Sequence, residues 1–194
     1  MIRFFDVVIS LLGISLLLPL FIIISVLIKL TSKGPIIYKQ SRVGRFGKDF
    51  YLLKFRTMKI DSEKFGLLTI GSADPRITKV GFFLRKYKLD ELPQLINVLK
   101  GDMSMVGPRP EVRKYVNLYS HDQMKVLSVR PGITDFASIK YANENELLKE
   151  SENPEYYYIS KIMPDKLKLN MEYLNNQSLY LYFSIILKTI FKKY

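Results

Sequence analysis

The stretch "VVISLLGISLLLPLFIIISVLI", residues 7–28, runs for 22 consecutive positions without a charged side chain. A membrane helix needs about 20 apolar residues, so this run is long enough to enter a bilayer. A cleaved signal peptide is the alternative, but no small-residue cleavage site follows, and Lys29, Lys33 and Lys39 come instead. The run therefore predicts a membrane anchor over residues 1–30.

Two features bear on how this anchor sits in the membrane. Pro19 lies near the middle, where it removes a backbone donor, frees the carbonyl of Ser15 and bends or breaks the helix. Positive charge flanks both ends, from Arg3 on one side to Lys29 and Lys33 on the other, and the positive-inside rule then places both termini in the cytoplasm. A re-entrant helix–break–helix in one leaflet satisfies both observations. A kinked spanning helix satisfies the proline, and these residues alone leave both open.

The overall charge points to an anionic partner. Lysine and arginine number 30 against 18 acidic residues, a formal net charge of +12. Nucleic acid, a membrane surface and a phosphorylated substrate all fit such a balance. The chain has no cysteine, which excludes disulfides and thiolate metal sites, and its single histidine, His121, excludes a histidine-rich metal site.

Residues 35–58, "PIIYKQSRVGRFGKDFYLLKFRTM", predict a β-hairpin, because two runs rich in β-branched and aromatic residues flank a turn with Gly44 and Gly47. Cations in the turn suit anionic lipid, where each contributes about 1 kcal/mol. Lys54 and Arg56, at the end of the second strand, are candidates to bind phosphate. Residues 61–78 predict a long loop, and helical spacing resumes over residues 80–89.

The stretch "KLDELPQLINVLKGDMSMVGPRPE", residues 88–111, places two carboxylates before an apolar helix that ends at Gly101. Helix capping is one explanation for Asp90 and Glu91. If Asp90 were the N-cap, however, Pro93 would be the third helical residue and would have no N–H to donate, so capping accounts for at most one carboxylate. An acidic pair among arginines suits phosphate chemistry, because Mg²⁺ prefers one or two carboxylates plus phosphate oxygens, and a carboxylate can attack phosphorus.

Several arginines are placed to assist such chemistry. Arg109 lies between Pro108 and Pro110, which hold the backbone rigid on both sides. Arg85 comes five residues before Asp90. Guanidinium groups bind phosphate in a bidentate manner, which makes these side chains candidate phosphate ligands.

Together these stretches resemble the bacterial sugar transferase family, the monotopic phosphoglycosyl transferases. The resemblance rests on the proline-interrupted apolar segment, "YKQSRVGRFGKDFYLLKFRTM", "LRKYKLDELPQLINVLKGDMSMVGPRPE" and "VRPGIT", in that order, over most of residues 1–134. Two positions depart from the family pattern. Leu18 precedes Pro19 where the family often has Ser, so the bend needs other support, such as Ser15. Asp135 and Phe136 follow "VRPGIT" where many members have Gly-Trp.

The resemblance implies an enzyme that transfers a phospho-sugar from a UDP-sugar to a polyprenyl phosphate such as undecaprenyl phosphate, and releases UMP. It implies that Asp90 is the nucleophile, that Glu91 assists it, and that Mg²⁺ binds beside Asp90. Arg56, Arg85 and Arg109 would hold phosphate groups. It implies a place in the assembly of a cell-envelope glycan, on the cytoplasmic face of the bacterial inner membrane, and it favours the re-entrant anchor.

The expected fold is helix-rich α+β, with a re-entrant helix over residues 1–30 and a cytoplasmic, membrane-associated catalytic domain over residues 31–194. Interfacial amphipathic helices should surround the site, including residues 178–194, "SLYLYFSIILKTIFKKY", where tyrosines and lysines suit the headgroup region. The chain reads as a minimal catalytic domain with its anchor. A homodimer is compatible with this reading.

Two other classes of function compete with the enzyme. A membrane-tethered nucleic-acid binder would use the net charge and the 13 tyrosines, but no recognition motif supports it, and we expect no nucleic-acid partner. A non-catalytic membrane scaffold would keep its function when Asp90 is replaced. The acidic stretch within residues 141–177 reads as a solvated helix and loop.

Overall fold

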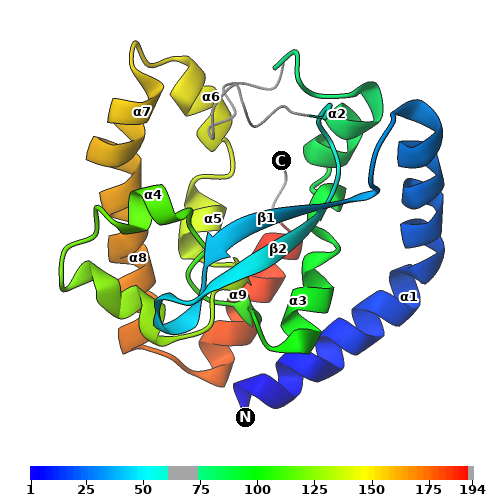
Figure 1. Cartoon of the computed structure of the whole chain (residues 1–194). Helices are drawn as coiled ribbons and strands as arrows, with labels where there is room; N and C mark the ends of the chain where they lie inside the picture. Colours follow the sequence, from blue (N-terminus) through cyan, green and yellow to red (C-terminus); the bar gives the residue numbers. More distant parts are fainter. Residues whose placement is uncertain (61–73, 192–194) are drawn as a thin grey trace.

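The chain forms a helix-rich α+β fold, as the sequence predicts (Figure 1). A computed structural model describes residues 1–60 and 74–191. The helices are α1 (Ile2–Thr31), α2 (Lys79–Lys86), α3 (Gln94–Lys100), α4 (Arg113–Val116), α5 (Phe136–Lys140), α6 (Glu144–Lys149), α7 (Pro154–Tyr157), α8 (Met163–Asn175) and α9 (Leu179–Ile190). The strands are β1 (Ile37–Val43), β2 (Asp49–Phe55), β3 (Ser104–Val106) and β4 (Gly132–Thr134).

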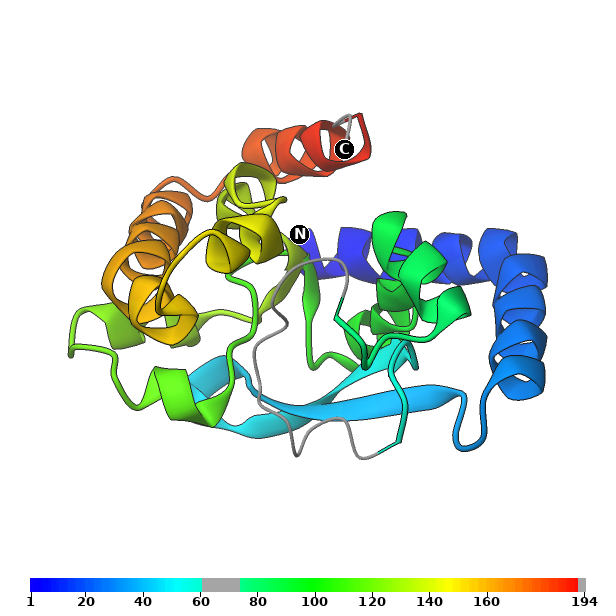
Figure 2. The same ribbon diagram turned by 90° about the horizontal axis from the view of Figure 1, so that it is seen from above.

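The membrane anchor is one long helix, α1, which contains Pro19. Its ribbon bends sharply part-way along its length (Figures 1 and 2). Proline is the usual cause of such a bend, because it removes one backbone hydrogen bond. The expected interruption is therefore a bend within a continuous helix, and Ser15 and Pro19 are both exposed on it. Within the described residues, α1 alone is long and apolar enough to cross a membrane.

The second part of α1 packs against β2 and α2. Ile24 and Ile28 are buried with Phe55 of β2 and Leu84 of α2. Most other apolar side chains of α1 remain exposed, as expected of a helix that faces lipid.

The N-terminal part of α1 is held by polar contacts that the sequence reasoning did not foresee. The carboxylate of Asp6 is buried and accepts hydrogen bonds from Ser104 Oγ (2.9 Å), the backbone N–H of Met105 (2.9 Å) and Tyr182 OH (2.8 Å). Arg3 donates to two carbonyl oxygens in the last turn of α3, at 2.6 and 3.0 Å. These contacts fix α1 to α3, β3 and α9.

The predicted hairpin is confirmed. Strands β1 and β2 pair antiparallel, with Ile37 opposite Phe55 and Val43 opposite Asp49. The turn contains a 3-10 segment, η1 (Arg45–Gly47), in which Gly47 has φ of 72°. The predicted loop over residues 61–78 lies mostly outside the described residues. After it, α2 begins at Lys79, one residue before the segment where helical spacing resumes, and ends at Lys86.

Two proline-rich loops lie side by side because β3 and β4 pair in parallel. The N–H of Gly107 donates to the Thr134 carbonyl, and the N–H of Gly132 donates to the Pro108 carbonyl, at 3.1 and 3.0 Å. A Cβ atom on Gly132 would lie 2.1 Å from the Gly107 nitrogen, so only glycine permits this approach. The stretches "VGPRP" and "VRPGIT" thus form one rigid unit.

The C-terminal segment forms helix α9, as predicted. Tyr182 and Ile185 are buried, whereas Tyr180, Leu187 and Ile190 are exposed. Figure 2 shows α9 on the side of the molecule opposite the β1–β2 hairpin. Its position at a membrane interface stays a prediction.

Candidate active site

The acidic pair lies in a short 3-10 turn, η3 (Leu89–Glu91), immediately before α3. Lys88 precedes it in the left-handed conformation, with φ of 56°, and reverses the chain after α2. The N-cap of α3 is Pro93, and no side chain caps this helix. Neither carboxylate therefore serves as the cap of α3, and the capping explanation is wrong for both.

Glu91 is held by two cations from distant parts of the chain. Its Oε1 accepts from Lys54 Nζ at 3.1 Å and from Arg109 Nη2. Burial alone would raise the pKa of Glu91, but the positive charges of Arg109 and Lys54 outweigh it and hold this pKa well below its ordinary range. Glu91 is thus ionised and fixed in place.

Asp90, unlike Glu91, has a buried carboxylate oxygen without a hydrogen-bond donor in the described part of the chain. It is only 8% exposed, and its Oδ1 has no hydrogen-bond partner among the described residues. Burial raises the pKa of Asp90 above its ordinary value, and Glu91 adds to this effect, although Lys54 and Arg85 oppose it. A buried carboxylate oxygen without a donor is poorly stabilised and therefore reactive toward an electrophile.

Arg109 is positioned by the rigid unit that β3 and β4 create. Its Nη1 donates to the carbonyl of Ile133 at 3.2 Å, and its backbone N–H donates to Asp135 Oδ2 at 3.2 Å. Asp135 is fully buried and also accepts from the N–H of Ser138 at 2.6 Å. The sequence marked Asp135 only as a departure from the family pattern, and its bond to Arg109 depends on pairing that no local signal reveals.

Glu111, the last residue of the "GPRPE" stretch, fixes the far end of the same loop. It accepts from Arg42 Nη1 at 3.0 Å, from its neighbouring N–H at Val112 at 2.8 Å, and from the hydroxyl of Tyr158. Tyr158 begins a π-helical turn, η5 (Tyr158–Ile162), between α7 and α8. The sequence reasoning gave no role to Glu111 or Tyr158.

The predicted phosphate ligands fall into two groups. Lys54 and Arg109 meet at Glu91, and Arg85 is close enough to affect the pKa of Asp90. Arg56 lies elsewhere: its Nη2 donates to the carbonyl and hydroxyl of Ser32, at 2.9 and 2.7 Å, in the turn after α1. The phosphate-binding role of all four residues stays a prediction.

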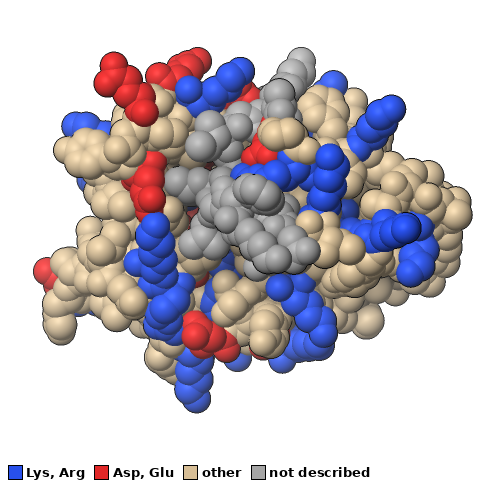
Figure 3. All heavy atoms as spheres, turned by 45° about the horizontal axis from the view of Figure 1, so that its top comes forward, with Lys and Arg blue, Asp and Glu red and all other residues tan. Residues whose placement is uncertain are grey.

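Lysine and arginine side chains are prominent on one face of the molecule. Figure 3 shows these side chains spread across the face, with acidic side chains at the top, on the left and at the bottom of the view. In residues 1–60 and 74–191, no group of three or more His, Asp or Glu side chains could hold a metal ion. One carboxylate plus substrate phosphates is enough for Mg²⁺, and the unpartnered Asp90 Oδ1 fits that requirement.

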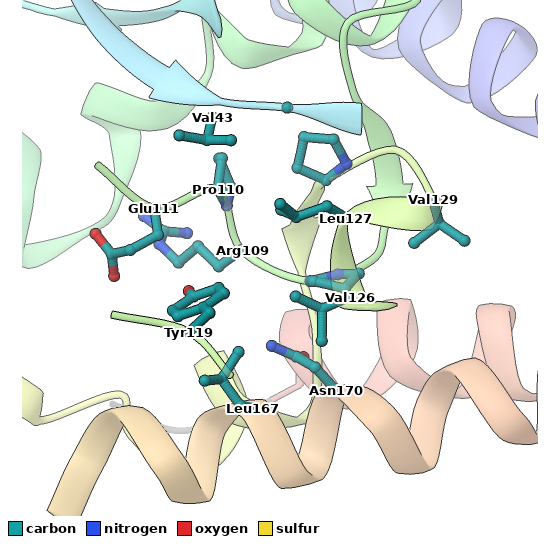
Figure 4. A pocket seen from close by; sticks show the side chains of 13 residues that line it. Val43, Arg109, Pro110, Glu111, Tyr119, Val126, Leu127, Val129, Leu167 and Asn170 are labelled. Atoms are coloured by element: carbon teal, nitrogen blue, oxygen red, sulfur yellow. The ribbon is translucent and has the colours of Figure 1, made fainter. Parts of the chain in front are cut away.

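A small cavity lies behind the Arg109 loop, between that loop and α8 (Figure 4). Its lining includes Pro110, Tyr119, Leu167 and Asn170. The volume of about 20 Å³ is enough for a water molecule but far too small for a sugar nucleotide.

Comparison with known proteins identifies the family of this chain. A model of the family described as bacterial sugar transferase matches residues 1–194. A UDP-N-acetylgalactosamine-undecaprenyl-phosphate N-acetylgalactosaminephosphotransferase of Aeromonas hydrophila is 41% identical over 162 residues, covering 81% of this chain and 38% of the relative. A UDP-glucose:undecaprenyl-phosphate glucose-1-phosphate transferase of Escherichia coli (strain K12) is 36% identical over 191 residues, covering 96% of this chain and 39% of the relative.

A shorter relative has a similar extent to this chain. The exopolysaccharide production protein ExoY of Sinorhizobium fredii is 39% identical over 157 residues, which cover 73% of this chain and 70% of the relative. By contrast, the chain spans less than half the length of the Aeromonas and Escherichia proteins. The match of the family model over the whole chain nevertheless settles its membership: the protein belongs to the bacterial sugar transferase family.

Proposed function

We propose that this protein transfers a phospho-sugar from a UDP-sugar to undecaprenyl phosphate or a similar polyprenyl phosphate, releasing UMP. The observation that carries the proposal is the contrast between the two adjacent carboxylates. Glu91 is bound by Lys54 and Arg109, whereas Asp90 Oδ1 is buried and unpartnered among the described residues. The Aeromonas and Escherichia relatives are named for this type of transfer, which supports the reading.

In the first step, a carboxylate oxygen of Asp90 attacks the β-phosphorus of the nucleotide sugar. A new O–P bond forms, the bond from this phosphorus to the bridging oxygen breaks, and its electron pair leaves with UMP. The product is an acyl phosphate between Asp90 and the phospho-sugar. In the second step, a phosphate oxygen of the polyprenyl phosphate attacks the same phosphorus, and Asp90 leaves as a carboxylate.

The other residues orient and neutralise the reacting groups. Glu91, the residue after Asp90, binds Lys54 and Arg109, so two cations would be available where phosphate charge accumulates. Arg85 adds a third charge near Asp90. Mg²⁺ bound at Asp90 would neutralise charge on the phosphate oxygens. Arg56 would serve a phosphate nearer the end of α1, to which Ser32 connects it.

The anchor suits a substrate whose phosphate lies at the bilayer surface. We propose that α1 enters one leaflet and returns, with the bend at Pro19, both termini in the cytoplasm and the catalytic part on the cytoplasmic face of the inner membrane. α9, with exposed Tyr180 and Leu187, would lie in the interface. A cysteine introduced at position 2 tests this topology, because labelling of that thiol from the periplasm would contradict re-entrance.

The reaction itself is tested with the full chain in nanodiscs, Mg²⁺, undecaprenyl phosphate and a panel of UDP-sugars, with UMP release as the measurement. We expect UMP release from one sugar that depends on the polyprenyl phosphate, and none from Asp90→Asn. Equal UMP release by Asp90→Asn would contradict the role of Asp90 as nucleophile. No release by the wild type from any donor would contradict the proposed function and favour the scaffold.

A further inference from the structure

A second buried polar atom, on a residue four positions after Asp90, also lacks a partner in the part of the chain that the structure describes. Gln94, the first residue of α3, is only 1% exposed, and its Nε2 has no hydrogen-bond partner among the described residues. Leaving a buried donor unpaired costs about 1–3 kcal/mol, and few buried polar groups in proteins remain so. A side-chain amide in this condition therefore calls for an explanation.

The same helix shows that a buried amide can be fully bonded in this fold. Asn97 Oδ1 accepts from the backbone N–H of Leu53 at 2.9 Å, and Asn97 Nδ2 donates to the Tyr51 carbonyl at 2.8 Å. These bonds fix α3 to β2. Asn97 is thus a structural amide, whereas no described residue receives the amide hydrogens of Gln94.

The two unpartnered atoms are close in sequence and opposite in character. Asp90 and Gln94 are four residues apart, and Leu92 and Pro93 between them both have right-handed helical geometry. Residues four apart in such geometry lie about one turn apart on the same side of the backbone. Asp90 Oδ1 offers electrons, and Gln94 Nε2 offers hydrogens. A phosphoryl group meets both needs, because its phosphorus is electrophilic and its non-bridging oxygens accept hydrogen bonds.

We propose that Gln94 is a further catalytic residue, whose Nε2 donates a hydrogen bond to a non-bridging oxygen of the phosphoryl group that Asp90 attacks. The proposal rests on the proposed phospho-sugar transfer. As the Asp90–phosphorus bond forms and the bond to the leaving UMP breaks, charge is distributed over these oxygens. A buried donor that is unpaired in the free protein can stabilise that charge without first breaking a hydrogen bond to another protein group.

The test compares the wild type with Gln94→Met, which keeps the size of the side chain and removes the donor. Removal of one such donor slows comparable reactions by about 100-fold or more. We expect a loss of this order in kcat for UMP release, with little change in the KM of the UDP-sugar. Intact-mass measurement without polyprenyl phosphate should show slower formation of the phospho-sugar adduct. The melting temperature should stay equal or rise, because an unpaired buried donor has been removed.

Two further variants serve as references. Gln94→Glu has the same shape but carries an acceptor and a negative charge in place of the donor, and it should also lose activity. Asn97→Leu removes the bonded amide on the same helix, and it should lower the melting temperature. Comparison of Gln94→Met with Asn97→Leu separates the loss of a catalytic donor from the loss of a structural one.

Each result has a definite meaning. A wild-type rate in Gln94→Met would show that Nε2 binds only a water molecule, and would overturn the proposal. A slower rate together with a lower melting temperature, as in Asn97→Leu, would assign Gln94 a structural role and overturn it as well. A wild type that releases no UMP would overturn the proposed function itself, which is a different result from a Gln94 variant that keeps the wild-type rate.

Discussion

Replacement of Glu91 by Gln tests whether this carboxylate organises the cations of the site. Gln has the same shape and keeps one acceptor oxygen, so the hydrogen bonds from Lys54 and Arg109 can persist without the charge that Glu91 supplies. The Lys54 ammonium and the Arg109 guanidinium would then lie close together, largely buried, without a negative charge between them. We expect the variant to be less stable and to transfer phospho-sugar slowly.

The size of the effect follows from burial. The side chains of Glu91, Lys54 and Arg109 are 16%, 19% and 30% exposed. Removal of one partner from a buried ion pair costs about 3–5 kcal/mol, and an exposed pair contributes about 0.2–1 kcal/mol. Because the group is mostly buried and Gln keeps one acceptor, we expect a loss of about 2 kcal/mol. For a chain of this size that is a fall in melting temperature of about 4–8 °C.

Thermal unfolding of the full chain in nanodiscs measures this loss. The pKa of Glu91 is depressed by Arg109 and Lys54, so its contribution to stability is complete above the ordinary value of 4.5 and is lost only as pH falls through the lower folded-state pKa. The difference between wild type and variant should therefore be the same at about pH 6 and pH 8. Asp122→Asn, in an exposed pair with Lys125, is the control and should change little. An unchanged melting temperature in Glu91→Gln would refute the assigned role.

Three more outcomes follow from the buried acids. Asp90→Asn should abolish UMP release and stabilise the protein at neutral pH by about 1 kcal/mol, because the ionised form of Asp90 is buried without a donor at Oδ1. Burial raises the pKa of Asp90 in the folded state, so the wild type carries this cost only at a pH above that value. Calorimetry at several pH values should therefore show the gain disappearing in acid, where Asp90 is protonated. The wild-type rate of UMP release should fall on the acid side with a midpoint above 3.8, the ordinary pKa of an aspartate, and a midpoint below it would contradict the burial effect. Asp6→Ala should cost about 3 kcal/mol because it leaves Ser104 Oγ, Met105 N–H and Tyr182 OH without their acceptor, whereas Tyr182→Phe should cost about 1 kcal/mol in the same unfolding assay.

The features that depend on local pattern could be predicted from the sequence. The apolar run before Lys29 forms a helix as predicted, although Pro19 lies inside one continuous helix and does not separate two, and Gly101 ends α3 with φ of 92°. The proline after the acidic pair correctly limited the capping explanation, since Pro93 itself takes the N-cap position. These outcomes follow from hydrophobic spacing and from the backbone limits of proline and glycine.

The features that depend on distant contacts could not be predicted. Glu91 and Arg109 are 18 residues apart, and Asp6 and Tyr182 are 176 apart. A single acid at the start of an apolar helix gives no local sign of which donors it will meet after folding. The same holds for Arg56, whose position at Ser32 depends on how α1 meets β2.

Residues that hold the site differ from the residue proposed to react in it by their hydrogen bonds within the fold. Four buried or half-buried side chains each take part in two or more hydrogen bonds: Glu91, Asn97, Asp135 and Glu111. Together these bonds fix α3, the hairpin and the Arg109 loop. Asp90 Oδ1, amid these bonded groups, has no such partner within the described residues. An unsatisfied buried group lowers stability, and at an active site the substrate can supply the missing partner. The stability of Asp90→Asn relative to the wild type therefore tests the role of Asp90 without any substrate. A more stable variant means that the Asp90 carboxylate destabilises the fold, as expected of a reactive group. A less stable variant means that Asp90 has a structural role, as Glu91 has.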